Sequence, residues 1–268
     1  GLPIPQALAD IFQAGSGMGG MRPKASVVDA AGQLWLAKFP SQNERLNIPV
    51  VEEAALRLAG LAGLNVPETR IEMVNGKAVM LIRRFDRAYP EGVEHRHHMI
   101  SALTLLGCHE RESIEKSYVD IADALRQHGA LDGIRTDLAE LFGRMVFNIL
   151  VTNDDDHLRN HALLWYQTSN SVGWRLSPLY DVVPRPMVAT ERYLHLSVGS
   201  QGRLATIDNA MTMYARFGLD QHEALEIIDR IWRVVRQWRG YFEDFKVPAE
   251  QIDQIGSAFR HIDTIWAK

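Results

Sequence analysis

The pattern of apolar and polar positions predicts two hairpins and one helix in the first third of the chain. Residues 24–39, KASVVDAAGQLWLAKF, carry β-branched and aromatic residues on both sides of the turn DAAGQ, which is typical of a hairpin. Residues 69–85, TRIEMVNGKAVMLIRRF, predict a second hairpin, because Asn75-Gly76 is a strong hairpin-turn sequence. Between them, residues 48–64 place apolar side chains at helical spacing and reach a glycine at Gly63.

Beyond residue 85 the apolar positions recur mainly at helical spacing, with a further hairpin expected ahead of the stretch SPLYDVVP. The sequence therefore predicts an α+β fold of two lobes, with a small sheet-rich lobe over residues 1–87 and a larger helical lobe over residues 88–268. The helices are expected within residues 113–129, 135–153, 207–219, 220–242 and 248–268.

Composition narrows the class of protein. The 268 residues are 46% hydrophobic and 23% charged, which is ordinary for a globular protein that is large enough for a substantial core. The net charge of −4 argues against wholesale binding of nucleic acid or of an anionic membrane. No apolar run approaches the length of about 20 residues that spans a bilayer. The single cysteine, Cys108, cannot form an internal disulfide, so we expect a cytoplasmic protein with Cys108 as a half-buried apolar residue.

Three aspartates in a row stand out in residues 153–164, NDDDHLRNHALL, which follow one apolar segment and precede another. Clustered carboxylates repel one another unless a proton or cation intervenes, and Asp and Asn oxygens suit Mg²⁺. Asp155 and Asn160 have the spacing of the protein-kinase catalytic loop, and Asp181 follows where such kinases keep a second metal ligand. The alternative is a solvated acidic loop that caps a helix.

Three earlier features fit the same chemistry, although each has an ordinary alternative. The glycine-rich residues 15–26, GSGMGGMRPKAS, could approach a phosphate closely or form a plain turn. Lys38 lies in an apolar strand, where it could contact a phosphate or simply reach solvent from the strand end. Glu52 could pair with Lys38 or, like Glu53, lie in the first helical turn because the helix dipole favours it there. The order of these features along the chain favours the functional interpretation.

The sequence resembles the HipA-like serine/threonine kinase family, the toxins of bacterial type II toxin–antitoxin systems. The matching segments are GGMRPKAS, WLAKFP, VEEAALRLAGLAGLNVPET, IRRFDR, NDDDHLRNHALL and SPLYDVVP. The resemblance implies a two-lobed kinase fold that binds ATP and Mg²⁺ and phosphorylates a serine or threonine of a protein. The family's targets include aminoacyl-tRNA synthetases.

The resemblance also implies roles for individual residues. Asp155 would be the catalytic acid/base, Lys38 would contact the α- and β-phosphates, and Asn160 and Asp181 would bind Mg²⁺. The remaining nucleotide contacts fall on a phosphate loop, a helix glutamate, a hinge, and residues lining the site. These are Gly19, Gly20, Met21, Arg22, Pro23 and Lys24 in the loop, Glu52 on the helix, Arg83, Arg84 and Phe85 in the hinge, and His157, Leu158, Arg159 and Tyr180 in the lining.

Three departures from the family bear on regulation and partners. Members often carry a serine pair in the phosphate loop, one of which is autophosphorylated; here Ser16 is followed by Gly17, so Ser16 is the candidate for this switch. The hinge position Arg83 is often acidic in the family. Long members have an additional N-terminal subdomain that contacts the antitoxin, a DNA-binding, HipB-like protein. The resemblance implies such a partner here, with a separate polypeptide or sequence outside these residues in place of the subdomain.

Two other functions are compatible with parts of the pattern. A catalytically silent kinase-fold module could bind an antitoxin–DNA complex, although Lys38, Asp155, Asn160 and Asp181 are all present. A metal-dependent nuclease could use the Asp/His/Asn cluster, but it would need a basic groove and would leave Lys38 and the glycine loop unexplained. We therefore expect no direct contact with nucleic acid and none with a membrane.

Overall fold

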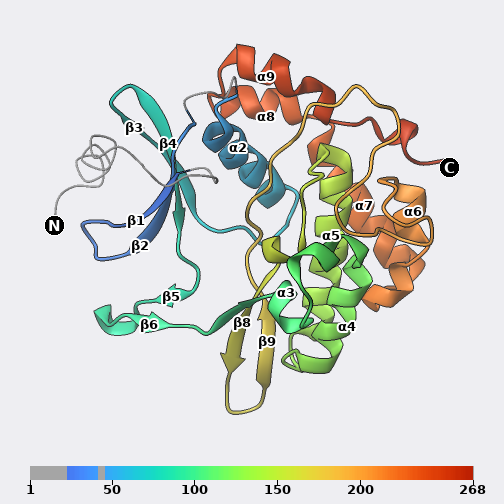
Figure 1. Cartoon of the computed structure of the whole chain (residues 1–268), viewed down its shortest axis with the longest axis horizontal. Helices are drawn as coiled ribbons and strands as arrows, with labels where there is room; N and C mark the ends of the chain where they lie inside the picture. Colours follow the sequence, from blue (N-terminus) through green and yellow to red (C-terminus); the bar gives the residue numbers. More distant parts are fainter. Residues whose placement is uncertain (1–22, 42–45, 268) are drawn as a thin grey trace.

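The structure is a computed structural model that describes residues 23–41 and 46–267. A small sheet-rich part lies beside a larger helical part, with one helix, α2, between the sheet and the other helices (Figure 1). Within the described ranges, no helix is long and apolar enough to cross a bilayer.

The four strands of the main sheet come from the two predicted hairpins, and both hairpins are confirmed. Strands β1 (Lys24–Val28) and β2 (Leu34–Lys38) pair antiparallel, as do β3 (Thr69–Val74) and β4 (Lys77–Arg83). The second turn has positive φ at both Asn75 and Gly76, which matches the right-handed twist of the strands. Because β2 also pairs with β4, the strand order is β1-β2-β4-β3.

Helix α2 (Ile48–Leu61) forms where the apolar periodicity predicts it. The side chain of Asn47 caps its N-terminus by accepting a hydrogen bond from the backbone N–H of Val50. The helix ends at Leu61, with Ala62 as its C-cap before Gly63 (φ 80°). The expectation that Glu52 lies in the first turn is wrong, because the helix begins at Ile48 and its first turn holds no acidic residue. The helix dipole therefore does not explain Glu52, which is buried.

The helical part contains the predicted helices with shorter bounds. Ser117 closes a capping box with Asp120, so that helix starts later than its apolar pattern suggests. The single helix predicted over residues 220–242 is broken at Gln237 into two helices. The helix predicted over residues 248–268 stops before Gly256. The helices are α3 (Ala102–Leu105), α4 (Tyr118–His128), α5 (Ile134–Val151), α6 (Ile207–Met211), α7 (Gln221–Val235), α8 (Trp238–Asp244) and α9 (Ala249–Ile255).

Two smaller sheets complete the fold. Strands β5 (Arg87–Ala88) and β6 (His95–Arg96) pair where the chain passes from the main sheet to the helical part. Strands β7 (Met99–Ser101), β8 (Ala162–Gln167) and β9 (Val172–Leu176) form a three-stranded antiparallel sheet. The predicted hairpin ahead of Asp181 is therefore β8–β9, and the acidic loop, residues 153–161, runs from the end of α5 to β8.

One hydrophobic core joins both parts of the molecule. Helix α5 is buried along most of its length and packs against α4 and α7, while α2 packs against β3 and β4 on one side and against α7 and α8 on the other. Met80 and Ile82 face this core, whereas Val79 and Leu81 point to a separate apolar cluster on the opposite face of the sheet. Helix α2 is thus fixed between the sheet and the helices.

Replacing Phe142 by alanine should lower the free energy of unfolding by about 3–5 kcal/mol, because Phe142 is fully buried on α5 and packs edge-on against Phe217 with ring centroids 5.4 Å apart. Urea denaturation would measure the change. The control Val188→Ala alters a side chain that is 98% exposed and should shift stability by less than about 0.5 kcal/mol. Equal midpoints for the two variants would contradict the packing described for α5.

Candidate active site

The ammonium group of Lys38 joins three elements that are distant in the sequence. Lys38 ends β2, and its Nζ lies 2.6 Å from Glu52 Oε1 on α2 and 2.9 Å from Asp181 Oδ1 beyond β9. The side chain is largely buried, so the alternative of a strand-end lysine that reaches solvent is wrong. A buried ammonium requires such partners, because an unpaired one would be strongly destabilising.

The three charges shift one another's pKa. Burial by itself lowers the pKa of Lys38, but the two carboxylates raise it above its ordinary value. Burial raises the pKa of Asp181, but Lys38, helped by Lys24 and His157, brings it below its ordinary value. Burial also raises the pKa of Glu52, and there Lys38 does not fully offset it. Two carboxylates therefore share one ammonium, and the cluster favours a further cation.

Asp181 is held in a backbone conformation that few residues adopt. Its φ of 61° lies in the left-handed region, which aspartate tolerates better than most residues but which is still unfavourable. The preceding residues are fixed: the Tyr180 hydroxyl donates to the Arg159 carbonyl at 2.7 Å, and the Leu179 N–H donates to the Asn65 carbonyl at 2.8 Å. These contacts turn the Asp181 carboxylate toward Lys38.

The three consecutive aspartates occupy three different environments. Asp155 is 54% exposed at its side chain, Asp154 is partly buried, and Asp156 is fully buried. Helix α5 ends just before them, with Thr152 in the left-handed conformation at φ 52°. The like charges are therefore tolerated in part because the chain turns sharply and places Asp156 in the core, away from the more exposed Asp155.

Asp156 anchors the loop in the core. Its Oδ2 lies within hydrogen-bonding distance of the Tyr118 hydroxyl on α4 (2.6 Å), Asn148 Nδ2 on α5 (2.7 Å) and His161 Nε2 (2.9 Å). Burial raises the pKa of Asp156, but His161 and Tyr118 together lower it below its ordinary value. These three partners were not predicted from the sequence, although a polar Asn148 within the long apolar stretch of α5 was a signal.

Asp155 and Asn160 lie on the same loop and touch. Asn160 Nδ2 donates to the Asp155 carbonyl at 3.1 Å, and no residue in the described ranges donates to Asn160 Oδ1. The His157 Nδ1 atom is buried and has no hydrogen-bond partner within these ranges. The loop therefore offers an amide oxygen and a ring nitrogen to which no described residue is hydrogen-bonded.

The residues around this loop are fixed in different ways. Leu158 is buried, and Arg159 pairs with Glu110 at 2.5 Å. The Asp155 carboxylate pairs with Arg185 at 2.7 Å, a contact that the sequence did not indicate.

The predicted hinge contributes one ring to the site. Phe85 follows β4, and its ring lies 5.7 Å from the ring of Tyr180, beside Asp181. The neighbouring Arg83 pairs with Glu68 at 3.2 Å and Arg84 pairs with Asp86, so both guanidinium groups are already bound to carboxylates. Phe85 is thus the hinge side chain that the structure brings toward the acidic loop.

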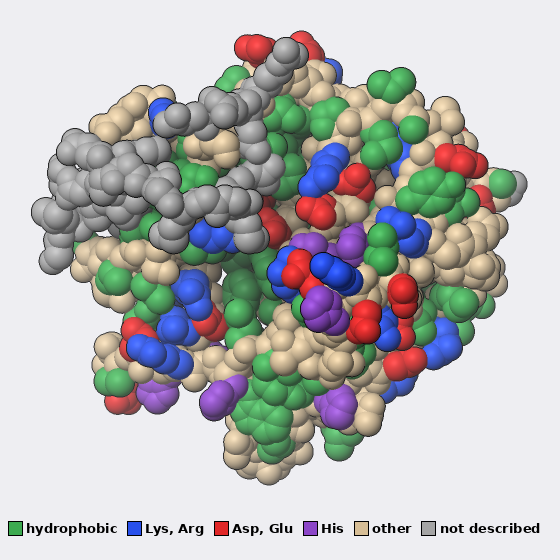
Figure 2. All heavy atoms as spheres, viewed as in Figure 1, with side chains coloured by type: hydrophobic (Ala, Val, Ile, Leu, Met, Phe, Trp, Pro, Cys, Tyr) green, Lys and Arg blue, Asp and Glu red, His purple; other side chains and the backbone are tan. Residues whose placement is uncertain are grey.

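The phosphate loop is only partly described. Gly19, Gly20, Met21, Arg22 and Ser16 lie outside the described residues. Pro23 and Lys24 are described at the start of β1, where Lys24 stands opposite Lys38 in the sheet register and contributes to lowering the pKa of Asp181. Figure 2 shows acidic, basic and histidine side chains gathered near the middle of the face of the molecule that it draws.

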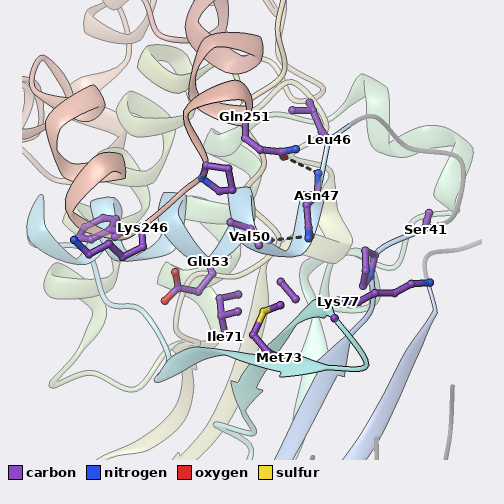
Figure 3. A pocket seen from close by; sticks show the side chains of 15 residues that line it. Ser41, Leu46, Asn47, Val50, Glu53, Ile71, Met73, Lys77, Lys246 and Gln251 are labelled. Atoms are coloured by element: carbon purple, nitrogen blue, oxygen red, sulfur yellow. Dashed lines mark hydrogen bonds between the residues drawn. The ribbon is translucent and has the colours of Figure 1, made fainter. Parts of the chain in front are cut away.

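A large groove lies elsewhere and contains none of the predicted site residues. Its volume is about 710 Å³, and its walls come from α2, β3 and the turn between α8 and α9 (Figure 3). Glu53 lines this groove, whereas the adjacent Glu52 pairs with Lys38. The groove and the Lys38 cluster therefore share α2 but are separate sites.

The side chains suit Mg²⁺ that is held together with phosphates. Within residues 23–41 and 46–267, no three His, Cys, Asp or Glu side chains gather closely enough to hold a metal ion by themselves. Mg²⁺ commonly binds through one or two protein oxygens plus substrate phosphates. Two side chains fit that pattern. Asp181 shares the Lys38 ammonium group with Glu52, and Asn160 Oδ1 receives no hydrogen bond from the described residues.

Fold and site together define a protein of the kinase-like class, with a sheet lysine, a helix glutamate and an acidic loop in kinase order. The chain belongs to the HipA-like C-terminal domain family, which matches residues 16–238. The resemblance seen in the sequence is thereby confirmed.

Relatives of known name support this assignment. Two Sinorhizobium fredii proteins are named "Putative kinase Y4dM", 26% identical over 231 residues, and "Putative kinase Y4mE", 28% identical over 184 residues. The alignments cover 80% and 65% of this chain but 53% and 40% of the relatives. The chain thus spans about half the length of the curated relatives it matches.

Two solved structures share the fold. HipA of Shewanella oneidensis MR-1, solved in complex with HipB and operator DNA, gives a TM-score of 0.69 at 17% identity, over 90% of this chain and 62% of that one. The Helicobacter pylori proinflammatory kinase CtkA gives 0.60 at 17% identity, over 94% and 93% of the two chains. The α+β, two-lobed kinase fold is confirmed, while the lobe boundary between residues 87 and 88 stays a prediction.

Replacing Asp156 by alanine should lower the free energy of unfolding by about 3–5 kcal/mol, because three buried polar groups lose their shared acceptor. The folded-state pKa of Asp156 lies below its ordinary value of 3.8, so its stabilising contribution is present above that value and is lost as the pH falls through the folded-state pKa. Denaturant titrations at neutral and acidic pH should therefore show the difference from wild type shrinking in acid.

The matched control is Asp229→Ala, which removes an exposed ion pair with Arg233 and should cost less than about 1 kcal/mol. A loss for Asp156→Ala no larger than that of the control would contradict the anchoring role of Asp156.

Proposed function

We propose that this protein is an ATP- and Mg²⁺-dependent kinase that phosphorylates a serine or threonine hydroxyl of a protein. The main observation in support is the position of Lys38 Nζ, which lies 2.6 Å from Glu52 and 2.9 Å from Asp181, beside the loop that bears Asp155 and Asn160. A lysine held by a helix glutamate, next to an acidic loop and an aspartate that can bind a metal, is the arrangement that protein kinases use for phosphoryl transfer.

The nucleotide would bind between the sheet and the acidic loop. Lys38 and Lys24 would face its phosphates, and Phe85 and Tyr180, whose rings lie 5.7 Å apart, would bound the adenine end. Asn160 and Asp181 would hold Mg²⁺, which neutralises phosphate charge when bound. Gly19, Gly20, Met21 and Arg22 complete the proposed phosphate loop.

Two side chains of the protein act directly in the proposed reaction. Asp155 would accept the proton that the acceptor hydroxyl loses as its oxygen bonds to the γ-phosphorus of ATP, with ADP as the leaving product. Lys38, kept charged by its two carboxylates, would stabilise the negative charge that develops on the phosphates. Glu52 would direct Lys38, since Glu52 is buried and cannot itself reach the acceptor.

The proposed substrate and partners come from the resemblance to the family. We propose a cytoplasmic toxin whose target is a protein such as an aminoacyl-tRNA synthetase, and whose inhibitor is a DNA-binding, HipB-like antitoxin. Support comes from the HipA structure, which was solved with HipB and operator DNA. The alignment covers 62% of that HipA chain, and the target and inhibitor are part of the proposal. Autophosphorylation at Ser16 is a further part.

Asp155→Asn should bind ATP normally but lose phosphoryl transfer by roughly 100-fold to 10,000-fold, because proton acceptance contributes to the transition state more than to the ground state. Incubation with γ-labelled ATP and a cell lysate would measure transfer, and calorimetry with a non-hydrolysable ATP analogue would measure binding. Equal labelling by wild type and variant would contradict the role of Asp155. No labelling by a wild-type protein that binds the analogue would favour a silent kinase-fold module.

Asp181→Ala should weaken Mg²⁺-dependent nucleotide binding by roughly 10-fold to 100-fold, because one proposed metal ligand is lost. Calorimetry with and without Mg²⁺ separates this effect from loss of the contact with Lys38, since only the Mg²⁺-dependent part of the affinity should fall. Asp123→Ala, which removes a surface carboxylate paired with Arg216, serves as the control and should bind like wild type. An unchanged Mg²⁺ dependence in Asp181→Ala would remove this residue from the site.

A further inference from the structure

Arg185 contacts two neighbouring carboxylates of the acidic loop, those of Asp154 and Asp155. Its Nη2 lies 2.7 Å from Asp155 Oδ2, and its Nε lies 3.2 Å from Asp154 Oδ1. One planar guanidinium group thus spans two adjacent carboxylates that would otherwise repel each other. No described residue donates a hydrogen bond to the remaining oxygen of Asp155, Oδ1.

The backbone that carries Arg185 is firmly attached to the same loop. The Arg185 N–H donates to the Thr152 carbonyl at 3.0 Å, and the Val183 N–H donates to Asn153 Oδ1 at 3.3 Å. The intervening residues 182–184 are buried. The guanidinium therefore approaches Asp155 from a fixed base, although the side chain itself is 47% exposed.

The same short segment also carries Asp181. At its first residue a carboxylate contacts Lys38 of the sheet, and four residues later a guanidinium contacts Asp155 of the acidic loop. Residues 181–185 thus connect the phosphate side of the proposed site with the side that would receive the acceptor hydroxyl. The length of this segment limits how far apart the two groups that it contacts, Lys38 and Asp155, can lie.

We propose that Arg185 is a positioning residue for phosphoryl transfer. It holds Asp155 through Oδ2 and leaves Oδ1 to accept the proton of the acceptor hydroxyl. This inference rests on the proposed kinase function and adds a residue to it. An exposed ion pair contributes little to stability, so we expect the loss of Arg185 to lower the rate of phosphoryl transfer and not the stability of the fold. A misplaced reacting group can lower a rate by about 100-fold.

The experiment uses the full chain with γ-labelled ATP and total lysate protein as the acceptor pool, and measures initial rates over a range of ATP concentrations. Arg185→Ala should lower the maximal rate by roughly 10-fold to 100-fold and leave the KM for ATP and the melting temperature unchanged. Arg185→Lys should recover part of the rate, because lysine keeps the charge but not the two-point contact. Added guanidinium ion at millimolar concentration should partly restore Arg185→Ala.

Arg239→Ala is the matched control. Arg239 is 52% exposed and pairs with Asp253 at 2.8 Å on the α8–α9 hairpin, so its loss should change neither rate nor stability. In an Asp155→Asn background, Arg185→Ala should have no further effect, because the residue acts through the Asp155 carboxylate.

Four outcomes would overturn the inference while the wild type transfers phosphate: an unchanged rate in Arg185→Ala, an increased rate, a change confined to the KM for ATP, or an equal loss in the Asp155→Asn background. A wild-type protein without transfer activity would overturn the proposed function, and this inference with it.

Discussion

The burial of one ammonium group between two carboxylates constrains the arrangement of the whole site. Lys38 can be buried at the end of β2 only because Glu52 and Asp181 lie within 3 Å of it. That requirement brings together the main sheet, α2 and the segment after β9. It is met because α2 packs on both the sheet and the helical part, and because Asp181 adopts a left-handed backbone conformation that directs its carboxylate inward.

The charges of the acidic loop also need partners, but they find them in a different way. Its three aspartates do not share one counter-ion, because Asp156 lies in the core whereas Asp154 and Asp155 both contact Arg185. Asp156 accepts three buried hydrogen-bonding contacts from α4, α5 and His161, and so attaches the loop to the core. Asp155 points outward and meets Arg185. Structural and chemical tasks are thereby divided between adjacent residues, which leaves the exposed carboxylate available for a substrate.

Local signals were sufficient for the elements that carry most of the candidate site. Asn75-Gly76 specified one hairpin through its turn geometry, and the apolar spacing after Asn47 specified α2. Local signals were insufficient where apolar spacing continued across an interruption. The stretch 220–242 keeps a helical pattern although the helix breaks at Gln237, and the stretch 248–268 keeps one although α9 covers only seven of its residues. Periodicity shows which residues face a core but does not show whether the backbone continues as one helix.

The sequence alone determined the family and the order of the charged residues along the chain, since these depend on motifs within short segments, and it offered the pairing of Lys38 with Glu52 as one of two interpretations. Only the tertiary structure decided which distant side chains support them. Arg185 contacts Asp155 across 30 residues, and Tyr118 contacts Asp156 across 38. Such contacts have no periodicity or spacing in the sequence, because they depend on how helices, sheet and loops pack against one another in space.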